Sequence, residues 1–202
     1  MSNLIRNNAI VENEWISVAL PAGEETVRKQ AGKVVLFKLT GEKTTTPEQI
    51  AATVIPENGK ILVPLSVWES RKSELTGRLQ KGELGIWLDT HELLENLVAS
   101  IDDINQLPLI AVHVERFADG RIFSIGHLLR TRYGYMNELR AFGDVLRDQL
   151  FFLKRCGYDS YLIRADRNAE DALASLKDFT QPYQGAVDDA LPVWRRVNRG
   201  AQ

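Results

Sequence analysis

The sequence is poor in cysteine and histidine. Cys156 is the single cysteine among 202 residues, which excludes an intramolecular disulfide and any zinc or iron–sulfur site built from several cysteines. The histidines His91, His113 and His127 stand 22 and 14 residues apart, too far for the close helical pair that holds a metal ion. We therefore expect no metal site.

Familiar cofactor and nucleophile signatures are missing too. No glycine-rich loop of the dinucleotide-binding or phosphate-binding type occurs, and no Gly-x-Ser-x-Gly elbow presents a serine. Cys156 is expected in the last turn of a helix, where the dipole disfavours a reactive thiolate. His113 lies in an apolar stretch, which favours a hydrogen-bonded core histidine over a ligand. The sequence indicates no cofactor and leaves open whether the protein is an enzyme.

Neither sign of charge is in excess. The 25 lysines and arginines nearly balance the 27 acidic residues, which argues against a nucleic-acid partner, since phosphates require a positive footprint. No apolar run approaches the ~20 residues of a membrane helix, and the first residues, MSNLIRNN, lack the apolar core of a signal peptide. We expect a cytoplasmic protein with no membrane partner.

The chain is expected to form a single domain over residues 1–202. Residues 1–55 are interpreted as a separate N-terminal β layer, in which EWISVAL (14–20) and KVVLFKL (33–39) form a small antiparallel pair. Residues 60–184 are the predicted core, and residues 185–202 are a C-terminal tail.

Within this core, apolar runs alternate with helix-period segments. The predicted strands are residues 61–65, 84–88, 107–114 and 161–163. A spacing of about 25 residues suits one strand plus one crossover helix. About five such units fit, so the predicted fold is α/β with a mostly parallel sheet. Five units are too few for an eight-fold barrel, which favours an open sheet or a partial barrel.

Capping residues mark where the predicted helices begin and end. Three pairs have the spacing of an N-terminal cap: Ser66 with Glu69, Asp89 with Glu92, and Asn168 with Asp171. Gly134 and Gly157 are expected to end two further helices in a left-handed conformation.

Residues 138–156 allow two interpretations. The first is a strand over residues 138–143, followed by a helix that Asp144 caps. The second is one long helix, in which Gly143 would cost about 1 kcal/mol relative to alanine. A faint repeat favours the strand: Leu-Arg-Ala at 139–141 recurs as Ile-Arg-Ala at 163–165, and each follows a Gly-Tyr pair.

Several charged residues are predicted at the carboxyl ends of the strands, where parallel α/β sheets bind ligands. Arg121 follows the Asp119-Gly120 turn and stands near a helix start, where the dipole disfavours a cation, so an anionic ligand would explain it. An ion pair of Arg121 with Asp119 or Glu115 explains it equally well.

Arg140 decides between the two interpretations of residues 138–156. In a parallel strand that is buried on both faces, its charge needs a partner or a ligand. In a long helix, Arg140 and Asp144 would form an exposed i, i+4 pair that requires neither. The repeat at Arg164 favours the strand, and with it a site.

The segment from Phe117 to Arg164 carries a dense pattern of glycine, arginine and acidic residues. Its main positions are Asp119, Gly120, Arg121, Ser124, Leu129, Arg130, Arg132, Gly134, Tyr135, Glu138, Leu139, Arg140, Ala141, Gly143, Asp144, Val145, Leu146, Asp148 and Gln149. This pattern resembles the bacterial domain-of-unknown-function family 934, most strongly over residues 84–184. Members of that family are often labelled oxidoreductases involved in sulfite reduction and are encoded near sulfite reductase.

The resemblance implies an accessory protein of assimilatory sulfite reduction. Combined with the charge pattern, it predicts a small anionic ligand bound by Arg121, Arg140 and Arg164, which Asp119 and Asp144 orient. Asp144 and Asp148 are the acid–base candidates if the protein is an enzyme. The alternative is a non-catalytic partner of sulfite reductase that uses Trp68, Trp87 or Trp194 as anchors. Exposed sheet edges are consistent with a homodimer.

Overall fold

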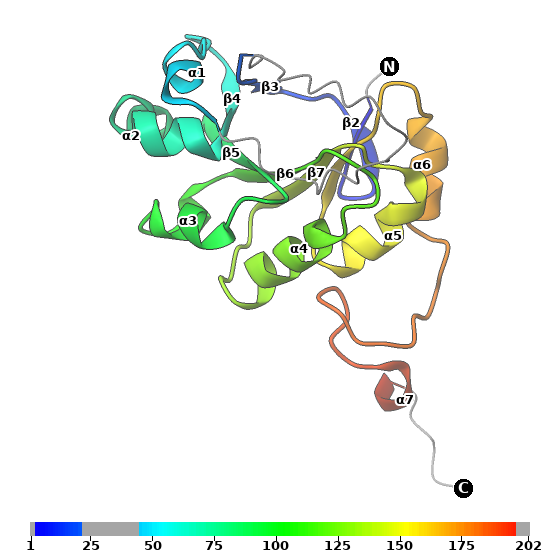
Figure 1. Cartoon of the computed structure of the whole chain (residues 1–202). Coiled ribbons are helices and arrows are strands. Elements are labelled where there is room, and N and C mark those ends of the chain that lie inside the picture. The colour runs from blue at the N-terminus through cyan, green and yellow to red at the C-terminus, as the bar shows by residue number, and fades with distance from the viewer. Residues whose placement is uncertain (1–2, 22–44, 197–202) are drawn as a thin grey trace, which may run out of the picture.

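The computed structural model describes residues 3–21 and 45–196, and its centre is one eight-stranded sheet (Figure 1). The strands follow the order β2-β1-β8-β7-β6-β5-β4-β3. Their bounds are β1 Leu4–Arg6, β2 Ala9–Val11, β3 Trp15–Ser17, β4 Lys60–Pro64, β5 Leu84–Asp89, β6 Leu109–Val114, β7 Glu138–Gly143 and β8 Ser160–Leu162.

The sheet is parallel from β3 to β8, as the alternating strands and helices predict. Its N-terminal end differs, because β1 pairs antiparallel with both β2 and β8. The four predicted core strands agree with β4, β5, β6 and β8 to within two residues. The prediction of a mostly parallel α/β sheet is therefore confirmed.

The two edges of this sheet are joined by a very short connection. β2 and β3 lie at opposite edges, yet only residues 12–14 separate them in the chain. Four extended steps from Val11 to Trp15 span at most about 14 Å. The sheet must therefore curl until its edges approach each other, which gives a half-barrel. This result selects the partial barrel over the open sheet.

The helices between residues 65 and 175 cover the outer face of the half-barrel, whereas the short helix at residues 193–196 lies apart from the sheet (Figure 1). The main core forms between strand residues that point outward, such as Ile86 and Ile110, and helix residues such as Leu75, Leu97 and Leu150. The helices are α1 Pro47–Ala51, α2 Leu65–Gln80, α3 Leu94–Ala99, α4 Arg121–Thr131, α5 Arg147–Arg155, α6 Ala169–Ser175 and α7 Val193–Arg196, with a 3-10 turn, η1, at Ile104–Gln106.

The inner face of the half-barrel has its own, smaller apolar cluster. Trp15 from β3 packs there against Leu62, Leu109 and Ala111, with Trp87 and Phe142 at its margin. No helix residue belongs to this cluster in the described part of the chain. In the central strands, alternate residues thus serve two separate cores, because successive side chains point to opposite faces.

The structure resolves the ambiguity at residues 138–156 in favour of the strand. Residues 138–143 form β7, and α5 begins only at Arg147. Gly143 ends the strand with a φ of 98°, a conformation that favours glycine. Gly134 and Gly157 also have positive φ values, as predicted for the residues that end helices.

Three local predictions at the N-terminus and at the caps are wrong. The antiparallel pair is formed by β1 and β2, whereas residues 15–17 pair in parallel with β4; residues 33–39 lie outside the described residues. Ser66 caps nothing, because α2 already begins at Leu65 after Pro64. Asp144 is not the cap of α5, which follows Leu146. Asn168 does cap α6.

The Leu-Arg-Ala repeat does not correspond to equivalent positions in the sheet. Arg140 pairs in register with Ser160 of β8, whereas Arg164 lies beyond the end of that strand. The two arginines therefore stand at different heights along the half-barrel, and the repeat has no structural counterpart.

Candidate functional site

Asp119 and Arg121 form a tight pair after the carboxyl end of β6. The Arg121 side chain donates Nε to Asp119 Oδ1 at 2.9 Å and Nη2 to Oδ2 at 2.6 Å. The Thr90 hydroxyl donates to the same carboxylate from the loop after β5. The Arg121 guanidinium, assisted by Thr90, lowers the pKa of Asp119 to about 2. This is the ion pair that the sequence offered as one of two explanations.

Asp144 and Arg164 form a second pair after the ends of β7 and β8. Arg164 Nη1 lies 2.7 Å from Asp144 Oδ1, while Nε and Nη2 each lie 2.9 Å from the Asp166 carboxylate. Asp144 also accepts the backbone N–H of Phe117. The hydrogen bond from Arg164 keeps the pKa of Asp144 below its usual value. The structure thus brings these two predicted site residues together.

Arg140 lies elsewhere, inside the half-barrel. Its side chain is buried and donates to Glu138 at 2.7 and 3.1 Å, to Ser160 Oγ at 3.2 Å and to Asn13 Oδ1 at 3.0 Å. At about 3.3 Å per strand residue, its Cα lies about 13 Å along the chain from Asp144. The partners that a buried position in a strand requires are therefore present. None of them belongs to the charged residues at the carboxyl ends of the strands.

The acid–base candidate Asp148 is exposed in the first turn of α5. It lines a cavity of about 230 Å³ between the starts of α5 and α6, together with Arg147, Arg167 and Asp171. The cations there already have carboxylate partners, since Arg147 binds Asp171 at 2.8 Å and Arg167 lies 3.6 Å from Asp166.

A pair that the sequence reasoning missed joins β5 to β6. His113 Nδ1 lies 2.6 Å from Asp89 Oδ1, and the side chains are 32% and 26% exposed. The two residues are register partners on adjacent strands. Their separation of 24 residues is close to one strand–helix unit, a signal that could have placed them together.

Aromatic rings surround the His113 imidazole on the inner face. Its centroid lies 5.0 Å from that of Phe142 and 5.8 Å from that of Trp87, and these two rings also contact each other edge-on at 5.8 Å. Gly143 faces the open edge of the imidazole: a Cβ built there would lie 2.8 Å from His113 Cδ2. His113 is thus a half-buried, oriented side chain rather than a fully buried core residue.

Glu92 lies against the same pair through the backbone of Asp89. Its Oε2 accepts the Asp89 N–H at 2.7 Å, so the pair predicted as a cap does form one hydrogen bond, although α3 begins only at Leu94. Burial raises the pKa of Glu92 to about 7. A carboxyl group that can hold or release a proton near neutral pH therefore lies beside Asp89.

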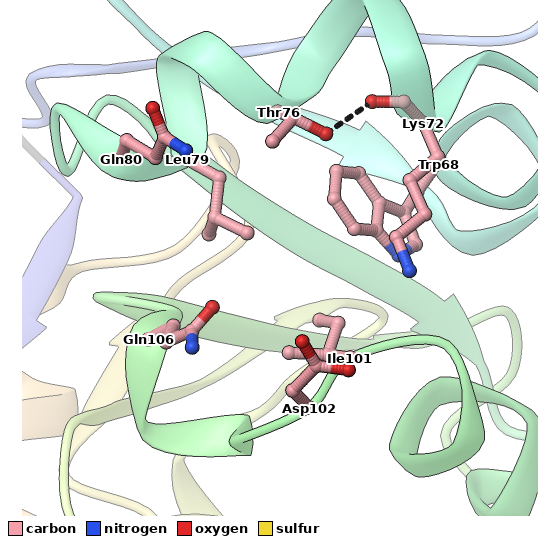
Figure 2. A pocket seen from close by; sticks show the side chains of 8 residues that line it. All are labelled: Trp68, Lys72, Thr76, Leu79, Gln80, Ile101, Asp102 and Gln106. Atoms are coloured by element: carbon pink, nitrogen blue, oxygen red, sulfur yellow. Dashed lines mark hydrogen bonds between the residues drawn. The ribbon is translucent and has the colours of Figure 1, made fainter.

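A further cavity lies on the outer side, between α2 and the segment that precedes β6 (Figure 2). It measures about 530 Å³ and is lined by one face of α2, including Lys72 and Gln80, and by Asp102 and Gln106. Because Asp102 and Gln106 precede β6, this cavity lies at the amino ends of the strands. Ligand sites of parallel α/β sheets lie at the opposite, carboxyl ends.

The remaining chemical candidates are unremarkable. Burial raises the pKa of Cys156 to about 11, in agreement with the structural role expected of it. In the described ranges there is no group of three or more histidine, cysteine or acidic side chains that could hold a metal ion. No helix of the described chain is long and apolar enough to cross a membrane.

Fold and site together define a curled α/β half-barrel with paired charges and an Asp–His pair at the carboxyl ends of its strands. The profile of the family described as bacterial protein of unknown function (DUF934) matches residues 85–194. This match covers more than half of the chain, including Asp89, His113 and the pairs Asp119–Arg121 and Asp144–Arg164, so the chain belongs to the DUF934 family. No curated protein and no solved structure matched it.

Proposed function

We propose that this protein binds a small anionic metabolite at the carboxyl ends of β6 to β8 and serves as an accessory protein of sulfite reduction. Arg164 carries the binding part of this proposal. Its side chain is 39% exposed, and three of its five N–H groups bind Asp144 and Asp166. Two N–H groups are therefore unused among the described residues and are held in a fixed orientation.

A fixed guanidinium favours a planar or tetrahedral oxyanion. Bidentate hydrogen bonds to such an anion lose little side-chain entropy when the fork is already ordered. Arg121, 42% exposed beside Asp119, supplies a second oriented guanidinium at the same end of the sheet. The resemblance stated above supports sulfite as the anion. Arg140 would act from the interior and only indirectly, through the strand that it anchors.

Titration calorimetry with sulfite, sulfate and phosphate at low salt tests the binding. We expect sulfite to bind, and Arg164→Gln to weaken its affinity at least about tenfold, the loss of roughly one charge-assisted hydrogen bond. The matched control is Arg147→Gln, since Arg147 is 50% exposed and also paired with an aspartate. Full affinity in Arg164→Gln, or no binding of sulfite by the wild type, would refute the assignment.

A second candidate function is a non-catalytic partner of sulfite reductase. Exposed aromatic residues favour it: Phe152, Phe179 and Trp194 are 51%, 65% and 48% exposed. Large exposed aromatic side chains are typical anchors of protein interfaces. Trp68 is fully buried and cannot serve as an anchor. Co-sedimentation with purified sulfite reductase tests this candidate, and we expect Phe152→Ser combined with Phe179→Ser to abolish the complex.

A further inference from the structure

The hydrogen bond between Asp89 and His113 defines the protonation of the imidazole. An ionised aspartate can only accept hydrogen bonds, so the proton of a neutral His113 must lie on Nδ1, the atom 2.6 Å from Asp89 Oδ1. Nε2 then carries the lone pair.

Nothing in the described part of the chain occupies Nε2. Within residues 3–21 and 45–196, the one hydrogen bond of the His113 side chain is to Asp89, and 32% of the side chain is accessible. Trp87 and Phe142 hold the plane of the ring from the inner face. The absence of a side chain at Gly143 leaves the ring edge uncovered where an alanine Cβ would lie 3.1 Å from Nε2.

The His113 imidazole could act as a base, but no protein nucleophile lies beside it among the described residues. Among the described residues, Asp89, Trp87 and Phe142 interact with its ring and Gly143 lies at the ring edge, and none of these four has a hydroxyl or thiol. The Thr90 hydroxyl is committed to Asp119. A proton removed by Nε2 would therefore come from water, which would be the attacking group.

We propose that His113 is a general base that activates water for hydrolysis of a small acyl substrate at the carboxyl ends of the strands, with Asp89 as its positioning residue. Nε2 takes a proton from water as the oxygen bonds to the acyl carbon. The carbon–oxygen bond to the leaving alcohol then breaks, and the imidazolium returns the proton to that oxygen. The products are an acid and an alcohol, and no oxidant or reductant is consumed.

Hydrolysis of 4-nitrophenyl acetate by the full-length protein tests this proposal. We expect His113→Gln to lower the rate above the buffer background by about 10²-fold or more, and the wild-type reaction to be slower in heavy water. His91→Gln and His127→Gln remove the other two histidines and should leave the rate unchanged. Added imidazole should restore activity to His113→Ala, which a merely structural role of His113 would not allow.

Asp89→Asn supplies the readout for positioning. We expect a lower rate together with a change in the nitrogen NMR signals of His113, showing a larger fraction protonated at Nε2. The proposal would be overturned if His113→Gln hydrolysed the ester at the wild-type rate. It would also be overturned by an acetyl group trapped on His113, because the imidazole itself would then be the nucleophile. This inference goes beyond anion binding. Because the test ester is neutral, a negative result in the hydrolysis assay has no bearing on the sulfite-binding test.

Discussion

Two arginine–carboxylate pairs of this protein have the same closest distance in opposite surroundings. Arg140 and Glu138 lie 2.7 Å apart inside the half-barrel, and Arg164 and Asp144 lie 2.7 Å apart at its edge. The exposed fractions are 2% and 13% for the inner pair but 39% and 28% for the outer one. Distance alone therefore says little: burial decides whether a pair holds the fold or stays available to a ligand.

Removal of the inner cation should have the largest effect. Arg140→Met leaves the partly buried Glu138 with Arg6, at 3.4 Å, as its cationic partner among the described residues, and it removes the donor that binds the buried Ser160 hydroxyl. We expect a loss of about 3–5 kcal/mol in the free energy of unfolding, measured in urea. The control Arg132→Met, at a 63% exposed side chain, should cost less than about 1 kcal/mol. If both variants lost the same free energy of unfolding, burial would not distinguish the inner pair from an exposed one.

The next largest effect is expected at Gly143, which lies between the two regions. Gly143→Ala places a Cβ 2.4 Å from the Val114 carbonyl oxygen at a φ of 98°. The backbone conformation alone costs about 1–3 kcal/mol, and the clash adds to that. Thermal unfolding should show the loss. Gly82→Ala, with a φ of 70° and open space around it, isolates the conformational part and should be milder.

A third prediction concerns Glu92, which is partly buried and has no cationic partner in the part of the chain that the structure describes. Because burial raises its pKa from 4.5 to about 7, the folded state holds a proton that the unfolded chain has already released. Stability should therefore fall as pH rises from about 4.5 to about 7 and then level off. Glu92→Gln should remove about 1–3 kcal/mol of this pH dependence.

Thermal unfolding at several pH values between 5 and 8 measures this effect of Glu92. The exposed Glu57→Gln is the control and should leave the slope of stability against pH unchanged. A wild-type slope in Glu92→Gln would show that the loss comes from another group.

The smallest effect on stability is expected at the edge. Arg164→Gln should change the free energy of unfolding by less than about 1 kcal/mol, because its ion pairs are solvent-exposed. Urea unfolding of this variant beside Arg140→Met gives the direct contrast of the two pairs. A loss as large as that of Arg140→Met would mean that Arg164 is structural and would leave the proposed ligand without its main donor.

Much of the fold could be predicted from local patterns. Apolar runs and their regular spacing identify the parallel strands, since both depend on residues close in sequence. The curl of the sheet could not be predicted, because it depends on β1 and β3 joining strands far along the chain. The same limit applies to Arg140, whose partner Asn13 comes from the N-terminal segment.

The site was predictable only in part. Asp119–Arg121 is a neighbour pair and was foreseen as one explanation of the charges, whereas the pairing of Asp144 with Arg164 required the structure. The sequence favoured a hydrogen-bonded His113, and the structure supplies that hydrogen bond. Its partner Asp89 was missed because an aspartate at that position also fits a helix cap. Counting one strand–helix unit between Asp89 and His113 would have placed the two residues side by side on adjacent strands.

The antiparallel contact of β1 with β8 sets an order of events during synthesis. β1 leaves the ribosome well before its partner at residues 160–162, which is among the last strands of the sheet to be made. At 5–20 residues per second, the interval is about 8–30 s. During that time the β1–β2 pair lacks β8, the strand that pairs with the other side of β1. The half-barrel is therefore completed late, and its N-terminal hairpin is the segment most exposed to premature association while the ribosome is still at work.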